Sequence, residues 1–267
     1  MHRHFATFVL LFCLCTPAFG DEVKETPVAW VTAAAAVDGD TFTLDQPVDG
    51  ATAVNLVGIQ APQISGGPGG IKAWPLAERS RDSLSDLVQG REVALRFTGP
   101  RADRHGRLLA HVYLDDGTWI QGEMLKHGLA RVFSFSDNRA LSAEMLSLED
   151  AARNQKRGIW SDPFYAIRTP EDVERHIGSF QIVEGRVVNA VRVKRYVYLN
   201  FGEDWRTDFT VSVPVKNLRR FDDAGLDLLS LTGRDIRVRG WLKEYSGAMI
   251  DATHPEQIEV LGPPSTD

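Results

Sequence analysis

Two short segments carry side chains that could bind a metal ion or a phosphate group. The first is Asp38-Gly39-Asp40-Thr41, where the Asp40 carboxylate offers the hard oxygen ligands that calcium prefers. The second is Asp103-Arg104-His105-Gly106-Arg107, whose guanidinium groups could make charged, two-point contacts with phosphate oxygens. The spacing alone also allows a plain turn aspartate and a basic hairpin tip, because arginine–aspartate pairs are ordinary at turns.

Strands and helices around these segments must hold them in place. Alternating apolar residues and flanking turns predict strands at residues 36–37, 42–44, 54–59, 93–97 and 108–114. Apolar residues at helical spacing predict three helices, near residues 75–90, 119–127 and 141–152. Strands come first and helices enter late, without strand–helix–strand alternation. This pattern predicts a mainly β protein with α-helices (α+β), built on a small antiparallel barrel.

A second unit follows, and it is nearly all strand. Strands are predicted at residues 180–188, 196–201, 209–213, 236–242 and 258–261, with one helical pattern at 221–231. Five strands with one intervening helix are typical of an OB-fold, so we predict a second small OB-like barrel. The domain boundaries are therefore placed at 28–160 and 179–262. The polar segment 161–178, which contains prolines, is predicted to be a linker.

The first unit resembles the staphylococcal nuclease (thermonuclease) family. The resemblance implies an OB-type barrel of five strands with three helices, in agreement with the pattern above. Five segments carry it, in the family's order and at similar spacing: residues 37–41 (VDGDT), 55–63 (NLVGIQAPQ), 103–107 (DRHGR), 128–132 (GLARV) and 157–160 (RGIW).

The resemblance implies a metal site, because family members cleave DNA and RNA phosphodiester bonds with one calcium ion. It gives Asp40 the role of a carboxylate ligand and Thr41 that of a carbonyl ligand. At Gln60 the family has a second aspartate ligand, and an amide oxygen there brings no charge to a hard cation. Calcium is therefore expected to bind only weakly.

The catalytic positions implied by the resemblance are only partly kept. Arg107 matches the arginine that stabilises charge on the pentacovalent phosphate, and Arg104 with His105 lies where the family contacts a terminal phosphate. Asn55 stands in place of a second arginine, and Gln63 stands in place of the glutamate base. A general base contributes about 10²–10⁴-fold to a rate, so losing the base and one phosphate clamp should remove most of the activity.

Charge and aromatic residues bear on nucleic-acid binding. The net charge is −6, and residues 21–164 hold 15 Lys and Arg against 20 Asp and Glu, which disfavours general polyanion binding. Ser134 and Ser136 stand near the positions where the family has tyrosines that stack on the nucleotide. The nearly neutral second unit interleaves basic clusters with aromatic residues, which would suit single strands on an OB-fold; the alternative is core rings and a solvated rim. Arg237 and Arg239 alternate with apolar residues and share one strand face.

The first 20 residues are predicted to be a signal peptide. An apolar run without charges, residues 5–15, precedes Ala18-Phe19-Gly20, which has small residues at the −3 and −1 positions of a cleavage site. The run is shorter than the ~20 residues of a membrane span, which disfavours an uncleaved anchor. Both cysteines lie in this segment, so disulfides and cysteine nucleophiles are excluded from the mature chain.

Export to the periplasm or the medium is therefore expected, with no transmembrane segment in the mature chain. N-terminal sequencing of the soluble product should begin near Asp21. A soluble product that still begins with Met1 would contradict export.

Three functions stay open at this level. The first is a degenerate nuclease-fold protein, a pseudoenzyme, that binds nucleic acid or a phosphorylated ligand with weak or no phosphodiesterase activity. The second is an active calcium-dependent endonuclease, a hydrolase that recruits another base such as Asp38 or Glu78. The third is a periplasmic protein-binding scaffold, which the acidic charge balance motivates.

Overall fold

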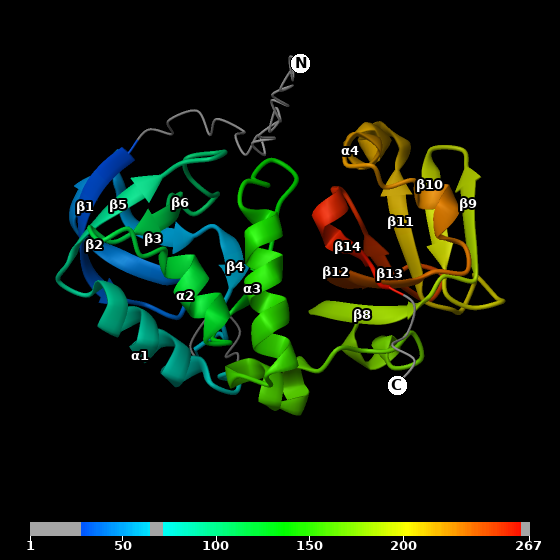
Figure 1. Cartoon of the computed structure of the whole chain (residues 1–267), viewed down its shortest axis with the longest axis horizontal. Helices are drawn as coiled ribbons and strands as arrows, with labels where there is room; N and C mark the ends of the chain where they lie inside the picture. The colour runs from blue at the N-terminus through cyan, green and yellow to red at the C-terminus, as the bar shows by residue number, and fades with distance from the viewer. Residues whose placement is uncertain (1–27, 65–71, 263–267) are drawn as a thin grey trace, which may run out of the picture.

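Figure 1 shows two β structures, one on either side of helix α3 (Ser142–Asn154). The computed structural model describes residues 28–64 and 72–262, so the predicted signal peptide lies outside the described residues. Within these two ranges, no helix combines the length and the apolar character that a membrane-spanning helix needs.

The first β structure is a closed five-stranded barrel, as the sequence predicts, but it is not antiparallel throughout, because β3 and β6 pair in parallel. The strands pair in the order β1-β2-β3-β6-β5, and β5 pairs back onto β1 in antiparallel register. Val93 and Leu95 of β5 are fully buried in the core of this barrel. The strands are β1 (Val28–Ala36), β2 (Thr41–Val48), β3 (Ala51–Leu56), β5 (Glu92–Arg96) and β6 (Leu108–Tyr113).

Three helices and a two-stranded ribbon complete this unit, and the three predicted helices are all present. Their apolar faces close the core, because Leu84, Met124 and Met145, one from each helix, are fully buried. The ribbon pairs residues 58–60, the middle of the segment 55–63, with residues 131–133, which overlap the end of the segment 128–132. The remaining elements are α1 (Ala77–Val88), α2 (Ile120–Lys126), β4 (Gly58–Gln60) and β7 (Arg131–Phe133).

The second β structure is a curled seven-stranded sheet. Pairing runs β9-β10-β11-β13-β12, and β12 also pairs with β8. Because β8 and β9 are two residues apart in the chain yet lie at opposite ends of this path, the sheet curls back on itself. The strand order then matches that of the first barrel, which is the OB-like arrangement. The strands are β8 (Phe180–Arg186), β9 (Asn189–Val193), β10 (Tyr196–Asn200), β11 (Thr210–Pro214), β12 (Asp235–Glu244), β13 (Ala248–Asp251) and β14 (Ile258–Val260).

Two details of the second unit differ from the prediction. The strand between β11 and β12 is β13, which was not predicted, whereas the predicted last strand β14 pairs with the other edge of β12. β13 has four residues, too few for an alternating pattern to stand out. The helical pattern at 221–231 is divided, because α4 (Leu218–Asp223) ends before Gly225, whose φ of 72° does not continue a helix.

The segment 161–178, predicted as a linker, is ordered by short helices and contacts both β structures. The Tyr165 hydroxyl donates to the Pro75 carbonyl at 2.7 Å, and the Arg168 backbone N–H donates to the Ile182 carbonyl at 2.9 Å. The 3-10 helices of the described chain are η1 (Gly158–Ser161), η2 (Pro163–Tyr165), η3 (Val173–His176), η4 (Val215–Asn217), η5 (Leu228–Leu231) and η6 (Pro255–Gln257).

Buried and half-buried polar contacts join the two β structures. Arg239 of β12 is buried and donates to both carboxylate oxygens of Glu149 in α3, at 2.9 and 3.1 Å. Arg139 and Glu256 form a second ion pair across the same boundary, with an N–O distance of 2.8 Å. These contacts hold β12 beside the first barrel, and they bring Trp241 to the edge of its cleft.

Candidate functional site

A cleft of about 770 Å³ opens on the first barrel, between β3, β4 and the hairpin that precedes β6. Thr41 is buried directly behind it, and its hydroxyl contacts the Asn55 and Arg107 side chains. The other seven residues that the sequence singles out line the cleft together: Asp40, Asn55, Gln60, Gln63, Arg104, His105 and Arg107.

The turn that carries Asp38 and Asp40 is pressed against helix α1. A Cβ atom at Gly39 would lie 1.9 Å from the Ser80 hydroxyl oxygen, so only glycine fits at this position. The same hydroxyl donates to the Leu129 carbonyl at 2.7 Å. Helix α1 therefore determines where the turn lies, and with it the position of the Asp40 carboxylate.

Both carboxylate oxygens of Asp40 already accept hydrogen bonds. Oδ1 accepts from the Thr41 hydroxyl at 3.0 Å and from the Asn55 amide at 3.1 Å. Oδ2 accepts from the Ala61 backbone N–H at 2.7 Å. The position that the resemblance assigns to a catalytic arginine thus holds a neutral amide that binds Asp40 instead of a phosphate.

Burial, and then the charge of Asp38, raise the pKa of Asp40 to about 7, although the Ala61 N–H and the Thr41 hydroxyl oppose this shift. A proton therefore competes for this carboxylate near neutral pH. Because the folded-state pKa lies above the unfolded value of about 3.9, ionising Asp40 opposes folding. Its contribution to stability becomes less favourable as the pH rises from about 4 to 7.

The side-chain oxygen of Gln60 is hydrogen-bonded to Arg131. This Oε1 atom accepts from Nε of Arg131 at 3.0 Å and from Nη2 of Arg131 at 2.8 Å. Arg131 is buried, and its guanidinium lies 4.6 Å from the centre of the Phe180 ring. The sequence reasoning missed Arg131 as a site residue, although it belongs to the segment 128–132 of the resemblance.

The basic side of the cleft comes from the hairpin before β6. Arg107 pairs with Asp103 at 2.7 Å, and its Nη1 donates to the Thr41 hydroxyl at 3.2 Å, while about a third of the side chain stays exposed. The Asp103 carboxylate also accepts from the backbone N–H groups of His105 and Arg107. Arg104 and His105 are exposed at the tip. The segment is therefore a basic hairpin tip that also faces the cleft.

Comparison with known proteins places this cleft in a family context. A family described as "Staphylococcal nuclease homologue" matches residues 53–162. An "Uncharacterized endonuclease" of Escherichia coli O157:H7 is 32% identical over 127 residues, which make up 47% of this chain and 73% of that protein. A "Micrococcal nuclease" of Shigella flexneri is 34% identical over 136 residues, 48% of this chain and 71% of that protein.

This chain belongs to the staphylococcal nuclease family. The resemblance seen in the sequence is thereby confirmed, and the second β structure lies beyond the residues that the family matches. A further relative, the "SPbeta prophage-derived endonuclease YokF" of Bacillus subtilis, is 34% identical over 139 residues, 51% of this chain and 45% of that protein.

In this family member the donor set does not fit a calcium ion. The Asp40 oxygens are engaged by three donors, and a cation at Gln60 would have to displace the Arg131 guanidinium from the same oxygen. Gln63 is exposed and brings no charge. Among the described residues, no group of three or more His, Cys, Asp and Glu side chains is placed to hold a metal ion. Calcium prefers several carboxylate oxygens, and this site offers too few.

Two exposed aromatic residues of the nuclease-family cleft were also missed by the sequence reasoning. Phe135, just after β7, is 46% exposed, and Trp241 of β12 is 53% exposed. The alternation of residues 133–136 could have indicated Phe135, because the intervening Ser134 turns away and its hydroxyl bonds His254 at 2.7 Å. No local signal indicates Trp241, since it comes from the second β structure.

Proposed function

We propose that this chain is an exported protein that binds nucleic acid in the cleft of its nuclease-family barrel and hydrolyses phosphodiester bonds weakly or not at all. The Gln60–Arg131 contact carries the proposal. It places a buried guanidinium at the oxygen where the family's chemistry needs a cation ligand. The basic hairpin and the exposed rings of Phe135 and Trp241 still suit a phosphate backbone and its bases.

The groups that remain support binding better than proton transfer. Gln63 can hydrogen-bond a water molecule, but a neutral amide cannot accept its proton at ordinary pH. Arg107 is oriented by Asp103 and Thr41, so its exposed edge is pre-organised to contact a phosphate. Binding without efficient turnover is what this combination supports.

An active endonuclease is the second candidate, and Asp38 favours it. Asp38 lines the cleft beside Asp40, so a carboxylate remains there that could accept a proton. Glu78, the other acid considered, pairs with Arg81 at 2.6 Å on helix α1 and does not line the cleft. The relatives named as endonucleases are consistent with this alternative.

Binding and cleavage can be measured separately on the purified mature protein. With EDTA present, a fluorescein-labelled DNA oligonucleotide should bind in a salt-dependent manner. Changing Arg104→Ala and Arg107→Ala together should weaken this binding and lower the salt slope by about two, one for each phosphate contact. The control is Arg79→Ala, because Arg79 is an exposed arginine of helix α1 that lies outside the cleft. This variant loses one positive charge where the double variant loses two, and it should bind DNA like the wild type.

Cleavage of plasmid DNA and RNA across a series of metal ions decides between the two candidates. Weak or absent turnover together with weak calcium binding in a calorimetric titration supports the proposal. Tight calcium binding that disappears in Asp40→Ala, accompanied by rapid cleavage, would favour the active endonuclease.

A further inference from the structure

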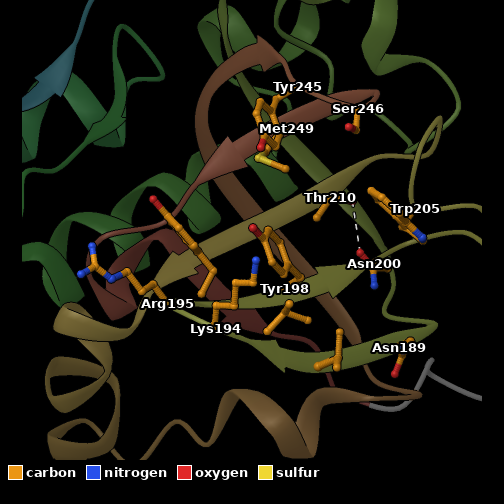
Figure 2. Close-up of a pocket in the computed structure, with 13 residues that line it drawn as sticks. Asn189, Lys194, Arg195, Tyr198, Asn200, Trp205, Thr210, Tyr245, Ser246 and Met249 are labelled. Atoms are coloured by element: carbon orange, nitrogen blue, oxygen red, sulfur yellow. Dashed lines mark hydrogen bonds between the residues drawn. The ribbon is translucent and has the colours of Figure 1, made fainter.

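A second pocket, of about 890 Å³, lies on the outer face of the second β structure and shares no lining residue with the cleft. Strands β9, β10 and β11 form its floor, and the hairpins β9–β10 and β12–β13 flank it (Figure 2). Among its lining residues are four aromatic and two basic side chains and no carboxylate: Tyr196, Tyr198, Trp205, Tyr245, Lys194 and Arg195.

The aromatic rings of this pocket face solvent instead of the core. Tyr196 and Tyr198 alternate along β10, so they share one face, and their rings stack with centroids 5.8 Å apart at 28°. Trp205 is 54% exposed and Tyr245 is 61% exposed. In Figure 2, Tyr198 lies in the middle of the pocket, with Tyr245 on one side and Lys194 on the other. The exposed parts of these rings offer flat surfaces for stacking, with the Arg206 guanidinium 4.7 Å from the centre of the Trp205 ring and the Lys243 ammonium 5.8 Å from that of Tyr245.

The charged side chains that line the pocket are both basic, although the chain is acidic. Lys194 and Arg195 are exposed in the β9–β10 hairpin and take part in none of the ion pairs of the described residues. Three of the acids near the pocket have other partners, whereas Glu203 and Glu244 are exposed beside it without lining it. Asp204 and Asp208 accept backbone N–H groups of their own loop, and Asp251 pairs with Lys243.

We propose that this face of the second β structure is a binding site for single-stranded nucleic acid. Trp205, Tyr198 and Tyr245 stack on successive bases, while Lys194 and Arg195 contact the phosphates. Unstacked bases are required, because the rings must reach the faces that a duplex hides. The basic hairpin distinguishes this ligand from a neutral oligosaccharide, which would also stack on tyrosine and tryptophan. The site stands on its own residues and does not depend on the first cleft.

The test uses the full mature chain and a fluorescein-labelled oligothymidylate of about 15 nucleotides, near the upper end of the span of one OB-fold. EDTA is present, and anisotropy gives the dissociation constant. Trp205→Ala and Tyr245→Ala should each weaken binding about tenfold, as the loss of one stacked base predicts. Both residues are more than half exposed, so folding should survive, and thermal melting checks this. Trp30→Ala removes an exposed ring from the first barrel and should leave the affinity unchanged.

To distinguish the two sites, Trp205→Ala and Tyr245→Ala (the ring changes) are each made in the wild type and in the Arg104→Ala/Arg107→Ala variant, and the affinity for oligothymidylate is measured. The inference is supported if the Arg104→Ala/Arg107→Ala variant still binds oligothymidylate and the ring changes remove that remaining binding. If the Arg104→Ala/Arg107→Ala variant alone abolishes binding and the ring changes have no effect in the wild type, the second site is wrong while the first cleft stands. If the ring changes abolish binding and the cleft changes do nothing, the second site stands and the first proposal fails. Saturable binding of a neutral oligosaccharide, with no effect of Lys194→Ala and Arg195→Ala on oligothymidylate, would overturn the inference.

Discussion

Replacing Arg239 with alanine is expected to lower the free energy of unfolding by about 3–5 kcal/mol, the range for breaking a buried ion pair. The side chains of Arg239 and Glu149 are 1% and 0% exposed. Without the arginine, the Glu149 carboxylate stays buried with only the Val132 N–H and Arg153 as partners. Urea unfolding followed by circular dichroism measures the loss.

The matched control is Lys243→Ala on the same strand. Lys243 and its partner Asp251 are both more than 40% exposed, so breaking this pair should change stability by no more than about 1 kcal/mol. A similar small change for Arg239→Ala would mean that the buried pair between the two β structures contributes little.

The stability difference between the wild type and Arg239→Ala should shrink in acid. Burial by itself would raise the pKa of Glu149, but the charge and hydrogen bonds of Arg239, helped by the Val132 N–H and Arg153, hold that pKa below its usual value. A lowered folded-state pKa adds stability that is present above the unfolded value of about 4.3 and is lost as the pH falls through the folded value. Unfolding curves at pH 7 and below pH 4 test this.

Arg239 also shows what an alternating strand pattern cannot predict. Alternation with Ile236 and Val238 predicts that Arg237 and Arg239 share a face, and both indeed contact Glu259. The pattern cannot say that α3 covers this face, because Glu149 lies 90 positions away in the chain. The face of β12 that carries Arg239 looks solvent-exposed in the sequence, but it is buried against helix α3.

Local patterns predicted the barrel and its three helices but not every strand bound. Strand β1 covers Val28–Ala36 where only 36–37 was predicted, and the predicted strand 54–59 is divided between β3 and β4. Buried positions such as Leu84 and Val88 recur at helical spacing in α1, and glycines close to the helix ends mark where the chain turns. Strand β13 was not predicted, because four residues are too few to show the alternation of apolar and polar residues that indicates a strand. The division of residues 221–231 was missed because Leu226 and Leu228 continue the apolar pattern past Gly225.

The candidate site was predictable in its residues but not in their partners. The family resemblance assigns Asp40, Asn55 and Gln60 to one site, and in the structure all three line one cleft. It gives no sign that Arg131, 71 positions after Gln60, engages the Gln60 oxygen. Trp241 is even more distant, and only the packing of the two β structures brings it to the cleft.

The triple variant Asn55→Arg, Gln60→Asp and Gln63→Glu is expected to cleave plasmid DNA with calcium at least about 100-fold faster than the wild type, the low end of what a general base contributes. A second carboxylate gives a hard cation a charged ligand, and the added arginine clamps phosphate at two points. All three positions line the same cleft as Asp40 and Arg107, so the new groups face one phosphate. Initial rates on supercoiled plasmid across a calcium series measure the gain.

Single changes should do little, because a base without a bound cation, or a cation without a base, leaves the unit incomplete. Gln60→Asp alone supplies a second charged ligand but neither a base nor a second phosphate clamp, and Arg131 stays beside it as in the triple variant. Asn55→Arg alone releases Oδ1 of Asp40 from the amide but supplies no base. Adding Asp40→Ala to the triple variant should abolish the gain and so tie it to this site. If the wild type already cleaves plasmid with calcium and the triple variant is no faster, the replaced residues are not defects, and Asp38 becomes the base to test next.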